Sequence, residues 1–343
     1  FFFNDTATTE IYTLSLHDAL PICVAVLGGG SFGTVIANLA AGNGCQTTQW
    51  LRDAELVAEM QDTHQNTRYL KGFDLHPALH FSTDLEQTVS QADLVFVAIP
   101  SKAFRQVVQT AKPYFQAKQM LVSMIKGIEA DSFALMSQII REEVPNARLG
   151  VLSGPNLAKE IAAKMPAGTV IASLDPELRT TVHQALACPY FRVFANTDIY
   201  GVELSGALKN IYAIATGIAQ AQKVGENTRS MLLTRALAEM SRFAVQLGAN
   251  PLTFLGLAGV GDLFATCSSP LSRNYQVGFA LGSGKKLNDI IADLEQTAEG
   301  INTIKQVKQQ ADKLGVYMPI VSGLYEVIYN EQPIAEVAAK MMN

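Results

Sequence analysis

The chain has 343 residues, of which 48% are hydrophobic and 17% are charged, and its formal net charge at neutral pH is −5. This length exceeds one ordinary hydrophobic core and predicts two domains, and the composition is globular rather than disordered. The acidic balance argues against a general nucleic-acid-binding protein, although a local basic pocket for an anion is compatible with it.

The four cysteines, Cys23, Cys45, Cys188 and Cys267, are scattered and form no Cys-x-x-Cys motif. This spacing argues against a zinc site or a disulfide framework and suits a reducing, cytoplasmic environment. We therefore expect no bound metal. Because the chain has no apolar run of roughly 18 residues, we also expect no membrane span.

Residues 1–22 differ from the rest of the chain. They contain no Lys or Arg and no starting Met, so they lack the basic region of a signal peptide. Their sequence resembles translated sequencing-adapter DNA fused to a truncated gene. We interpret residues 1–22 as a poorly ordered, non-native leader, and a genuine N-terminal extension is the alternative.

The next segment joins a short apolar run to the motif Gly-x-Gly-x-x-Gly, formed by Gly28, Gly30 and Gly33. An apolar helical pattern follows, and this strand–loop–helix order is typical of a dinucleotide site. Gly28 would allow the tight turn, Gly30 the approach of a pyrophosphate, and Gly33 the packing of helix on strand. The pyrophosphate would then lie at the positive end of the helix dipole. A purely structural glycine turn is the alternative.

Strand-like and helix-like patterns alternate as far as residue 198. Near-continuous apolar runs are typical of parallel strands covered on both faces, and the alternation predicts a Rossmann-like, doubly wound parallel α/β sheet over residues 23–198. We expect strands at Val24–Leu27, Gln46–Leu51, Leu94–Ile99, Met120–Ile125, Leu149–Leu152, Thr169–Ala172 and Arg192–Phe194. We expect helices at Ala103–Ala111, Ser132–Glu143 and Pro176–Ala187.

Residues 199–343 show little sign of strands. Apolar residues recur at helical spacing in Asn227–Leu247, Thr303–Leu314 and Val321–Tyr329, which predicts an all-α C-terminal domain that carries the substrate site and the catalytic residues. No long linker separates the two domains, so we expect them to pack closely around a cleft.

The nucleotide preference depends on the residues after the second expected strand. An NAD site usually has Asp or Glu there for the ribose hydroxyls, whereas an NADP site offers Arg to the 2′-phosphate. Here Arg52 and Asp53 occupy these positions. Arg52 suits a 2′-phosphate and Asp53 suits a helix cap, so we expect NADPH with NADH tolerated. A solvated surface charge is the alternative for Arg52.

Two further strand ends carry polar groups. Lys126 follows an apolar run, and ligands of open α/β sheets gather outside the carboxyl ends of the strands, although a lysine there is often only solvated. The segment Ser153–Glu160 is another strand-to-helix turn, in which Asn156 and backbone N–H groups would suit a polar substrate. A capped helix start explains that segment equally well.

In the helical half, Lys209 lies among small and apolar residues. Burial lowers the pKa of a lysine, which suits a general acid or base, and a surface lysine on an amphipathic helix is the alternative. Asp262 lies among glycines and apolar residues. Since a buried carboxylate needs a partner, we expect it to pair with Lys209.

Ser272, Arg273 and Asn274 are three consecutive polar donors suited to a phosphate, with an ordinary surface loop as the alternative. Glu299 opens the sequence Glu-Gly-Ile-Asn-Thr, which a helix cap alone would explain. The five histidines form no recognisable constellation, so a dehydrogenase with a His–Asp pair is disfavoured.

In this order, the motifs resemble those of the bacterial-type NAD(P)-dependent sn-glycerol-3-phosphate dehydrogenase family. The resemblance runs from Val24 to the C-terminus, and it is specific because it rests on the whole ordered set. The set comprises Gly-Gly-Gly-Ser-Phe-Gly-Thr (28–34), Ile-Pro-Ser (99–101), Lys-Gly-Ile-Glu (126–129), Ser-Gly-Pro-Asn-Leu-Ala-Lys-Glu (153–160), Gly-Ala-Leu-Lys-Asn (206–210), Ala-Gly-Val-Gly-Asp-Leu (258–263), Ser-Arg-Asn (272–274) and Glu-Gly-Ile-Asn-Thr (299–303).

The resemblance implies reversible hydride transfer between NADPH or NADH and dihydroxyacetone phosphate, which forms sn-glycerol 3-phosphate for glycerophospholipid synthesis. It implies that Lys209 donates the proton in reduction, that Asp262 lies beside it and that Lys126 contacts the substrate near the nicotinamide. The implied substrate-binding residues are Lys126, Gly154, Asn156, Lys209, Asp262, Ser272, Arg273 and Asn274. The implied cofactor-binding residues are Gly28, Gly30, Ser31, Phe32, Gly33, Arg52, Lys126, Ala158, Arg273, Thr297 and Glu299.

Two positions depart from the family pattern: Asn156 stands where Thr is more usual, and Thr297 lies in a variable stretch. A homodimer is a family-level expectation only. One alternative is a β-hydroxyacid dehydrogenase, which also has a helical domain and a catalytic lysine but lacks the Ser-Arg-Asn segment. Another is a non-catalytic NAD(P)-sensing protein, which would leave Lys126, Lys209 and Asp262 without a common purpose.

Overall fold

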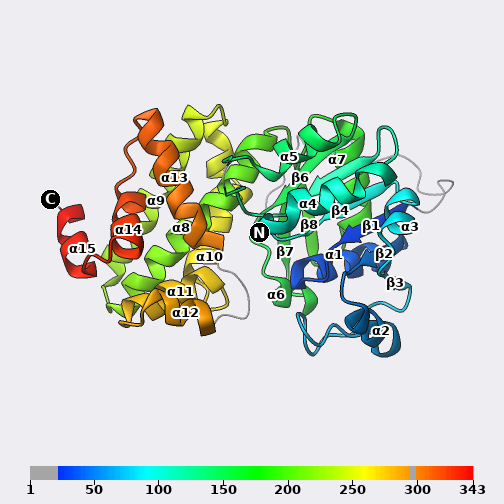
Figure 1. The fold of residues 1–343 in the computed structure, drawn as a ribbon, viewed down its shortest axis with the longest axis horizontal. Coiled ribbons are helices and arrows are strands. Elements are labelled where there is room, and N and C mark those ends of the chain that lie inside the picture. The colour runs from blue at the N-terminus through cyan, green and yellow to red at the C-terminus, as the bar shows by residue number, and fades with distance from the viewer. Residues whose placement is uncertain (1–21, 131, 294–298, 343) are drawn as a thin grey trace.

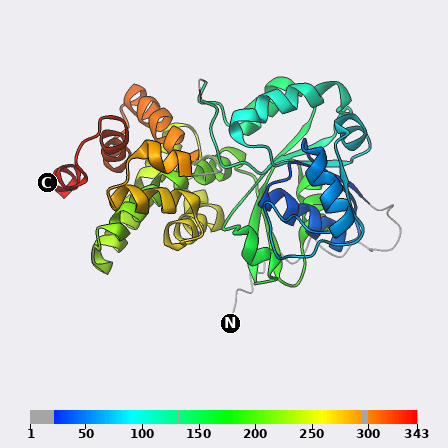
Figure 2. The same ribbon diagram turned by 60° about the horizontal axis from the view of Figure 1, so that its bottom comes forward.

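The computed structural model describes residues 22–130, 132–293 and 299–342. Figures 1 and 2 show a sheet with its helices at one end of the molecule and a body of helices at the other, with the C-terminus at the far end. Apart from Ile22, the predicted leader lies outside the described residues, and so does Thr297. Within those described ranges, no helix combines the length and the apolar character needed to cross a membrane.

Within the part of the chain that the structure describes, eight strands form one sheet in the order β3-β2-β1-β4-β5-β6-β7-β8. They are β1 (Cys23–Leu27), β2 (Gln46–Trp50), β3 (Leu79–Ser82), β4 (Leu94–Val97), β5 (Met120–Ser123), β6 (Arg148–Ser153), β7 (Ala167–Ala172) and β8 (Phe191–Asn196). All seven predicted strands are present. Neighbouring strands are parallel as predicted, except that β6 and β7 are antiparallel.

Strand β3 was not predicted from the sequence. This strand has four residues, Leu-His-Phe-Ser, and only Leu79 and Phe81 are buried. So short an alternation gives too weak a signal to separate an edge strand from a loop.

The central strands are buried on both faces, and their alternate side chains enter two different cores. In β1, Val24 and Val26 join the core that contains Ile36, whereas Ala25 and Leu27 join the core that contains Phe104. Ile36 belongs to α1 and Phe104 to α4, so helices cover both faces of the sheet. This is the physical reason for the continuous apolar runs in the sequence.

The helices of the sheet half are α1 (Ser31–Gly42), α2 (Ala54–Thr63), α3 (Leu85–Ser90), α4 (Ser101–Ala111), α5 (Met136–Glu143), α6 (Ala158–Ala162) and α7 (Pro176–Leu186), with a 3₁₀ turn η2 (Lys112–Tyr114). The predicted helix Ser132–Glu143 begins four residues late. Phe133 has a φ of 60°, and Leu135 pairs with Ile128 in an isolated bridge, so helical geometry starts only at Met136.

From Ile199 on, the described residues contain helices and connecting segments but no strand. The elements are α8 (Ile199–Ala221), α9 (Glu226–Gln246), η3 (Pro251–Leu255), the π-helical η4 (Leu257–Gly261), α10 (Asp262–Ser268), α11 (Arg273–Gly282), α12 (Leu287–Asp293), α13 (Glu299–Leu314), α14 (Pro319–Tyr329) and α15 (Ile334–Met342). The three helices predicted here correspond to α9, α13 and α14.

Helix α8 connects the two halves. It is buried from Gly201 to Ile218 and packs against β6 and β7 as well as α9, α10, α11 and α13. Glycines allow α11 to approach it closely: a Cβ on Gly278 would lie 2.0 Å from the carbonyl oxygen of Ile214, and one on Gly217 would lie 2.1 Å from that of Tyr275. The backbones of the two helices are therefore in direct contact.

Replacing Gly278 by Ala should destabilise the protein by about 3 kcal/mol, because the added methyl group must push two backbones apart. Urea unfolding of the wild type and the Gly278→Ala variant would measure the loss. The matched control is Gly42→Ala in α1, where a Cβ meets no atom within 4 Å and helix propensity favours Ala by up to about 1 kcal/mol. Equal stability of the two variants would contradict the close packing.

Glu203 ties α8 to the sheet half through a buried contact. Its side chain is 1% exposed, and its Oε1 accepts a hydrogen bond of 3.0 Å from the backbone N–H of Ser137 in the first turn of α5. Burial raises the pKa of Glu203 to about 7, against the opposing effect of hydrogen bonds from Ser137 and Met136.

Because the folded pKa of Glu203 lies above the ordinary value of 4.5, its contribution to stability is complete below that value and is lost as the pH rises through about 7. The Glu203→Gln variant keeps the hydrogen-bond acceptor. Relative to this variant, the free energy of unfolding of the wild type should fall by up to about 3 kcal/mol between pH 5 and pH 8. Urea unfolding at several pH values would test this, and parallel pH curves would contradict it.

Candidate active site

The glycine loop between β1 and α1 has the shape that a pyrophosphate requires. Gly28 has a φ of +122°, and a Cβ there would lie 2.5 Å from the carbonyl oxygen of Ala98. A Cβ on Gly33 would lie 2.7 Å from the carbonyl oxygen of Gly28, whereas one on Gly30 would meet nothing within 4 Å. Gly30 is also the N-cap residue, and it has no side chain that could cap the first N–H groups of α1. The loop therefore leaves an open cradle of N–H donors for an anion.

Three polar side chains brace this loop. Buried Gln49 donates to the carbonyl oxygen of Gly28 at 2.8 Å, and Asn66 donates to that of Gly29 at 2.9 Å. The hydroxyl of Ser31 donates to the carbonyl oxygen of Tyr69 at 2.5 Å. Ser31 was predicted from the sequence, whereas Gln49 and Asn66 were not, because their partners come from distant parts of the chain.

The end of β2 carries the two residues that were singled out for the nucleotide. Arg52 is exposed. Asp53 is the N-cap of α2, as predicted, and its Oδ1 accepts from the N–H groups of Glu55 and Leu56, both at 3.1 Å. Its Oδ2 pairs with Arg68 Nη1 at 2.7 Å.

Two lysines share one buried carboxylate. Lys126 Nζ donates to Asp262 Oδ2 at 2.7 Å and to the carbonyl oxygen of Gly154 at 2.6 Å. Lys209 Nζ donates to Asp262 Oδ1 and, at 2.5 Å, to the hydroxyl of Thr266. The Asp262 side chain is 1% exposed, that of Lys209 8% and that of Lys126 17%. The predicted contact between Lys209 and Asp262 is confirmed.

The packing of two helices on one edge of the sheet brings these groups together. Lys126 and Gly154 follow β5 and β6, which are parallel neighbours, so both lie at the same edge of the sheet. Lys209 comes from α8, and Asp262 begins α10. One turn before Lys209, Gly206 brings α8 onto this edge: a Cβ there would lie 2.6 Å from Ser153 Oγ and 3.2 Å from Lys126 Cγ.

The electrostatics of the cluster favour binding of negative charge. Burial, opposed by the negative charge of Asp262 and assisted by the positive charge of Lys209, lowers the pKa of Lys126 to about 7. When both lysines are protonated, two ammonium groups face one carboxylate. The cluster then holds an excess positive charge in a largely buried place, where it interacts strongly with an oxygen that becomes negative.

Two residues of the cluster were not predicted. Thr266 contacts both Lys209 and Asp262, and its position four residues after Asp262 on a helix is the signal that would have found it. Asn210 donates from Nδ2 to the carbonyl oxygen of Lys126 at 3.1 Å. It lies next to Lys209 in sequence but has no pattern that marks it.

The Ser-Arg-Asn segment begins α11 rather than forming a loose surface loop. Ser272 is the N-cap residue, and Ser272 and Asn274 are buried while Arg273 is exposed. Asn274 Oδ1 accepts from the N–H of Gly300 at 3.1 Å, and a Cβ on Gly300 would lie 2.8 Å from the carbonyl oxygen of Asn210. The first turns of α11 and α13 therefore lie beside the lysine cluster.

Glu299 bridges the two halves. Its Oε1 accepts from the hydroxyl of Ser101 at 3.2 Å and from the backbone N–H of Ser101 at 3.4 Å, at the N-terminus of α4. Burial raises the pKa of Glu299. Phe32 and Ala158 are both partly buried and pack against one core, where α1 meets α6.

Asn156 is turned toward β7. Its Nδ2 donates to the carbonyl oxygen of Gly168 at 3.1 Å, and its Oδ1 accepts from the hydroxyl of Thr169 at 3.0 Å. Of the two residues named in this segment, Gly154 touches the lysine cluster directly and Asn156 supports the adjoining turn.

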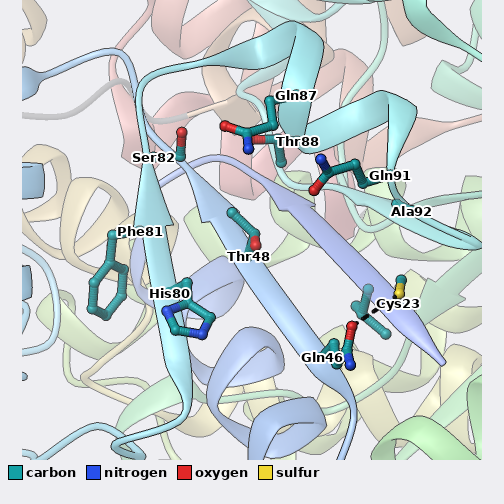
Figure 3. Close-up of a pocket in the computed structure, with 11 residues that line it drawn as sticks. Cys23, Gln46, Thr48, His80, Phe81, Ser82, Gln87, Thr88, Gln91 and Ala92 are labelled. Atoms are coloured by element: carbon teal, nitrogen blue, oxygen red, sulfur yellow. Dashed lines mark hydrogen bonds between the residues drawn. The ribbon is translucent and has the colours of Figure 1, made fainter. Parts of the chain in front are cut away.

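A separate polar cavity lies at the opposite, amino end of β1 (Figure 3). It is lined by Cys23, Gln46 and His80 of the sheet, by Gln87 of α3 and by Gln91, which directly follows α3. Among the site residues that the structure describes, none lines this cavity.

Comparison with known proteins agrees with the motifs. The family described as NAD-dependent glycerol-3-phosphate dehydrogenase matches with its N-terminal part at residues 23–179 and with its C-terminal part at residues 198–339. This chain belongs to that family.

Two curated relatives carry the name glycerol-3-phosphate dehydrogenase [NAD(P)+]. The relative from Acinetobacter baylyi is 61% identical over 93% of this chain and 89% of its own length. The relative from Alcanivorax borkumensis is 56% identical over 93% of each chain. The crystal structure of glycerol-3-phosphate dehydrogenase from Coxiella burnetii matches with a TM-score of 0.89 and 33% identity, over 94% of this chain and 99% of that one.

In this family member, Asp262→Asn should destabilise the fold by about 3 kcal/mol at neutral pH, because it leaves Lys126 and Lys209 without their counter-ion. The loss should shrink near pH 9, where Lys126 is neutral. Urea unfolding at both pH values would measure it. Asp312→Asn is the control, since it removes an exposed partner of Lys308 and should cost less than about 1 kcal/mol. A loss equal to that of the control would contradict the electrostatic role of Asp262.

Proposed function

We propose that this chain catalyses reversible hydride transfer between NADPH or NADH and dihydroxyacetone phosphate, with sn-glycerol 3-phosphate as the reduced product. The observation that carries the proposal is the pair of lysines on one buried carboxylate, at the sheet edge where the strand ends converge. The names of the relatives at 56% and 61% identity support the same activity.

The chain's own residues suit a dinucleotide along the sheet edge. The open cradle at Gly30 and the uncapped N-terminus of α1 would hold the pyrophosphate, and exposed Arg52 would bind a 2′-phosphate. Further cofactor contacts are assigned to Ser31, Phe32, Ala158, Arg273, Thr297 and Glu299. The bound nicotinamide supplies the hydride, and the protein supplies orientation and electrostatics.

The lysine cluster would supply the proton and stabilise the negative charge that develops during reduction. As a ketone is reduced, its oxygen becomes negative and needs a proton. Lys209, oriented by Asp262 and Thr266, is the proton donor, and in the reverse direction it accepts the proton from the alcohol. Lys126 adds positive charge where the negative charge builds up.

The substrate phosphate is assigned to the first turn of α11. Arg273 is exposed there, and a guanidinium next to helix N–H groups suits a phosphate. Ser272 and Asn274 complete this segment, while Gly154 and Asn156 shape the adjoining turn after β6.

We also propose that the protein works in the cytoplasm and forms a homodimer. Cys45, Cys188 and Cys267 are not in disulfides, which fits a reducing compartment. The homodimer rests on the family resemblance alone.

Lys209→Ala should lower the turnover of dihydroxyacetone phosphate by about 10²–10⁴, the usual contribution of a positioned general acid. NADPH oxidation, repeated with NADH, gives the rate. Lys164→Ala removes an exposed lysine and should leave the rate unchanged. Unchanged turnover in Lys209→Ala would remove Lys209 from this role. A folded, cofactor-binding protein that oxidises neither nucleotide would overturn the proposed function and direct the search to β-hydroxyacids such as 3-hydroxyisobutyrate.

A further inference from the structure

The carboxyl end of β2 carries a second arginine that the sequence pattern did not indicate. Arg68 lies 16 residues after Arg52 in the chain, in the loop that follows α2, yet its Nη1 is 2.7 Å from Oδ2 of Asp53, the residue next to Arg52. The ion pair thus brings Arg68 to the end of β2 that also carries Arg52.

The loop that carries Arg68 is fastened to the glycine loop on both sides of this residue. Before it, Asn66 donates to the carbonyl oxygen of Gly29 at 2.9 Å. After it, the backbone carbonyl oxygen of Tyr69 accepts a hydrogen bond of 2.5 Å from the hydroxyl of Ser31. Arg68 therefore lies between the pyrophosphate cradle and the end of β2. In a dinucleotide-binding fold, the ribose next to the adenine is bound between these two points.

Arg68 can leave its ion pair with Asp53 and bind another acceptor with little loss of stability. The Arg68 side chain is 59% exposed and that of Asp53 is 43% exposed, so the pair contributes little to stability. The N–H groups of α2 bind Oδ1 of Asp53, whereas Arg68 binds Oδ2. Asp53 therefore keeps its capping role if Arg68 turns to another acceptor. The guanidinium also lies over the ring of Tyr69, 5.7 Å from its centroid, which restricts its positions.

We propose that Arg68 is a second specificity-determining residue for the nucleotide: together with Arg52 it binds the 2′-phosphate of NADPH, and Asp53 holds it in place when no 2′-phosphate is present. This inference rests on the proposed function, because it assumes a dinucleotide in the cradle at Gly30. A phosphate dianion is a stronger partner for a guanidinium than a single carboxylate.

The test uses two nucleotide fragments that differ only by the 2′-phosphate. The affinities of 2′,5′-ADP and 5′-ADP for the full chain would be measured by calorimetric titration. Arg68→Gln should weaken 2′,5′-ADP binding about tenfold or more, the usual effect of losing a charge-assisted hydrogen bond, and should leave 5′-ADP binding unchanged. Asp53→Asn, which keeps a capping oxygen, should tighten 2′,5′-ADP binding, because Arg68 is no longer neutralised.

The control is Lys71→Gln, which removes one exposed positive charge from the same loop. Three results would overturn the role of Arg68: an equal loss for both fragments in Arg68→Gln, an equal effect of Lys71→Gln, or no discrimination between the fragments by the wild type. Because these measurements need no turnover, they separate the two proposals. Selective binding without reduction of dihydroxyacetone phosphate would overturn only the proposed function, and normal turnover with an inert Arg68 would overturn only this inference.

Discussion

The buried carboxylate of Asp262 is the contact on which the site depends. It is the shared hydrogen-bond acceptor of Lys126 and Lys209, whose ammonium groups would otherwise repel each other in a place with little solvent. Lys126 follows a strand of the sheet, whereas Lys209 and Asp262 belong to the helical half. The ion pairs therefore hold the two halves together and also position the reacting groups. A change in the packing of the two halves would displace these charged groups.

That packing is set by the sequence of α8. A helix that contacts a sheet on one side and other helices elsewhere must be apolar or small around its whole circumference. Gly206 allows contact with the ends of β5 and β6, and Gly217 allows contact with α11. Between them, Lys209 is the charged residue whose burial is compensated by Asp262 and Thr266. Helix α8 therefore provides both the close approach to its neighbours and the burial of a compensated charge.

Prediction from the sequence succeeded where a local motif or the cost of a buried charge constrains the structure, and it failed where neither does. The glycine loop was predictable because strand, turn and helix follow one another, and the pairing of Lys209 with Asp262 followed from the cost of a buried charge. The contact between Lys126 and Asp262 spans 136 residues, and no local pattern encodes it. The antiparallel pairing of β6 with β7 escaped prediction for the same reason, since an apolar strand reads the same in either direction.

The two charged ends of the proposed site differ in physical character. The pair of Asp53 with Arg68 is exposed and weakly stabilising, so its partners can change with the ligand at little energetic cost. The cluster of Lys126, Lys209 and Asp262 is buried, and rearranging it would leave an uncompensated charge. A nucleotide end that tolerates different ligands can therefore coexist with a reacting end that holds its charges in one arrangement. This division follows from solvent exposure alone, since both ends use the same kinds of ion pair.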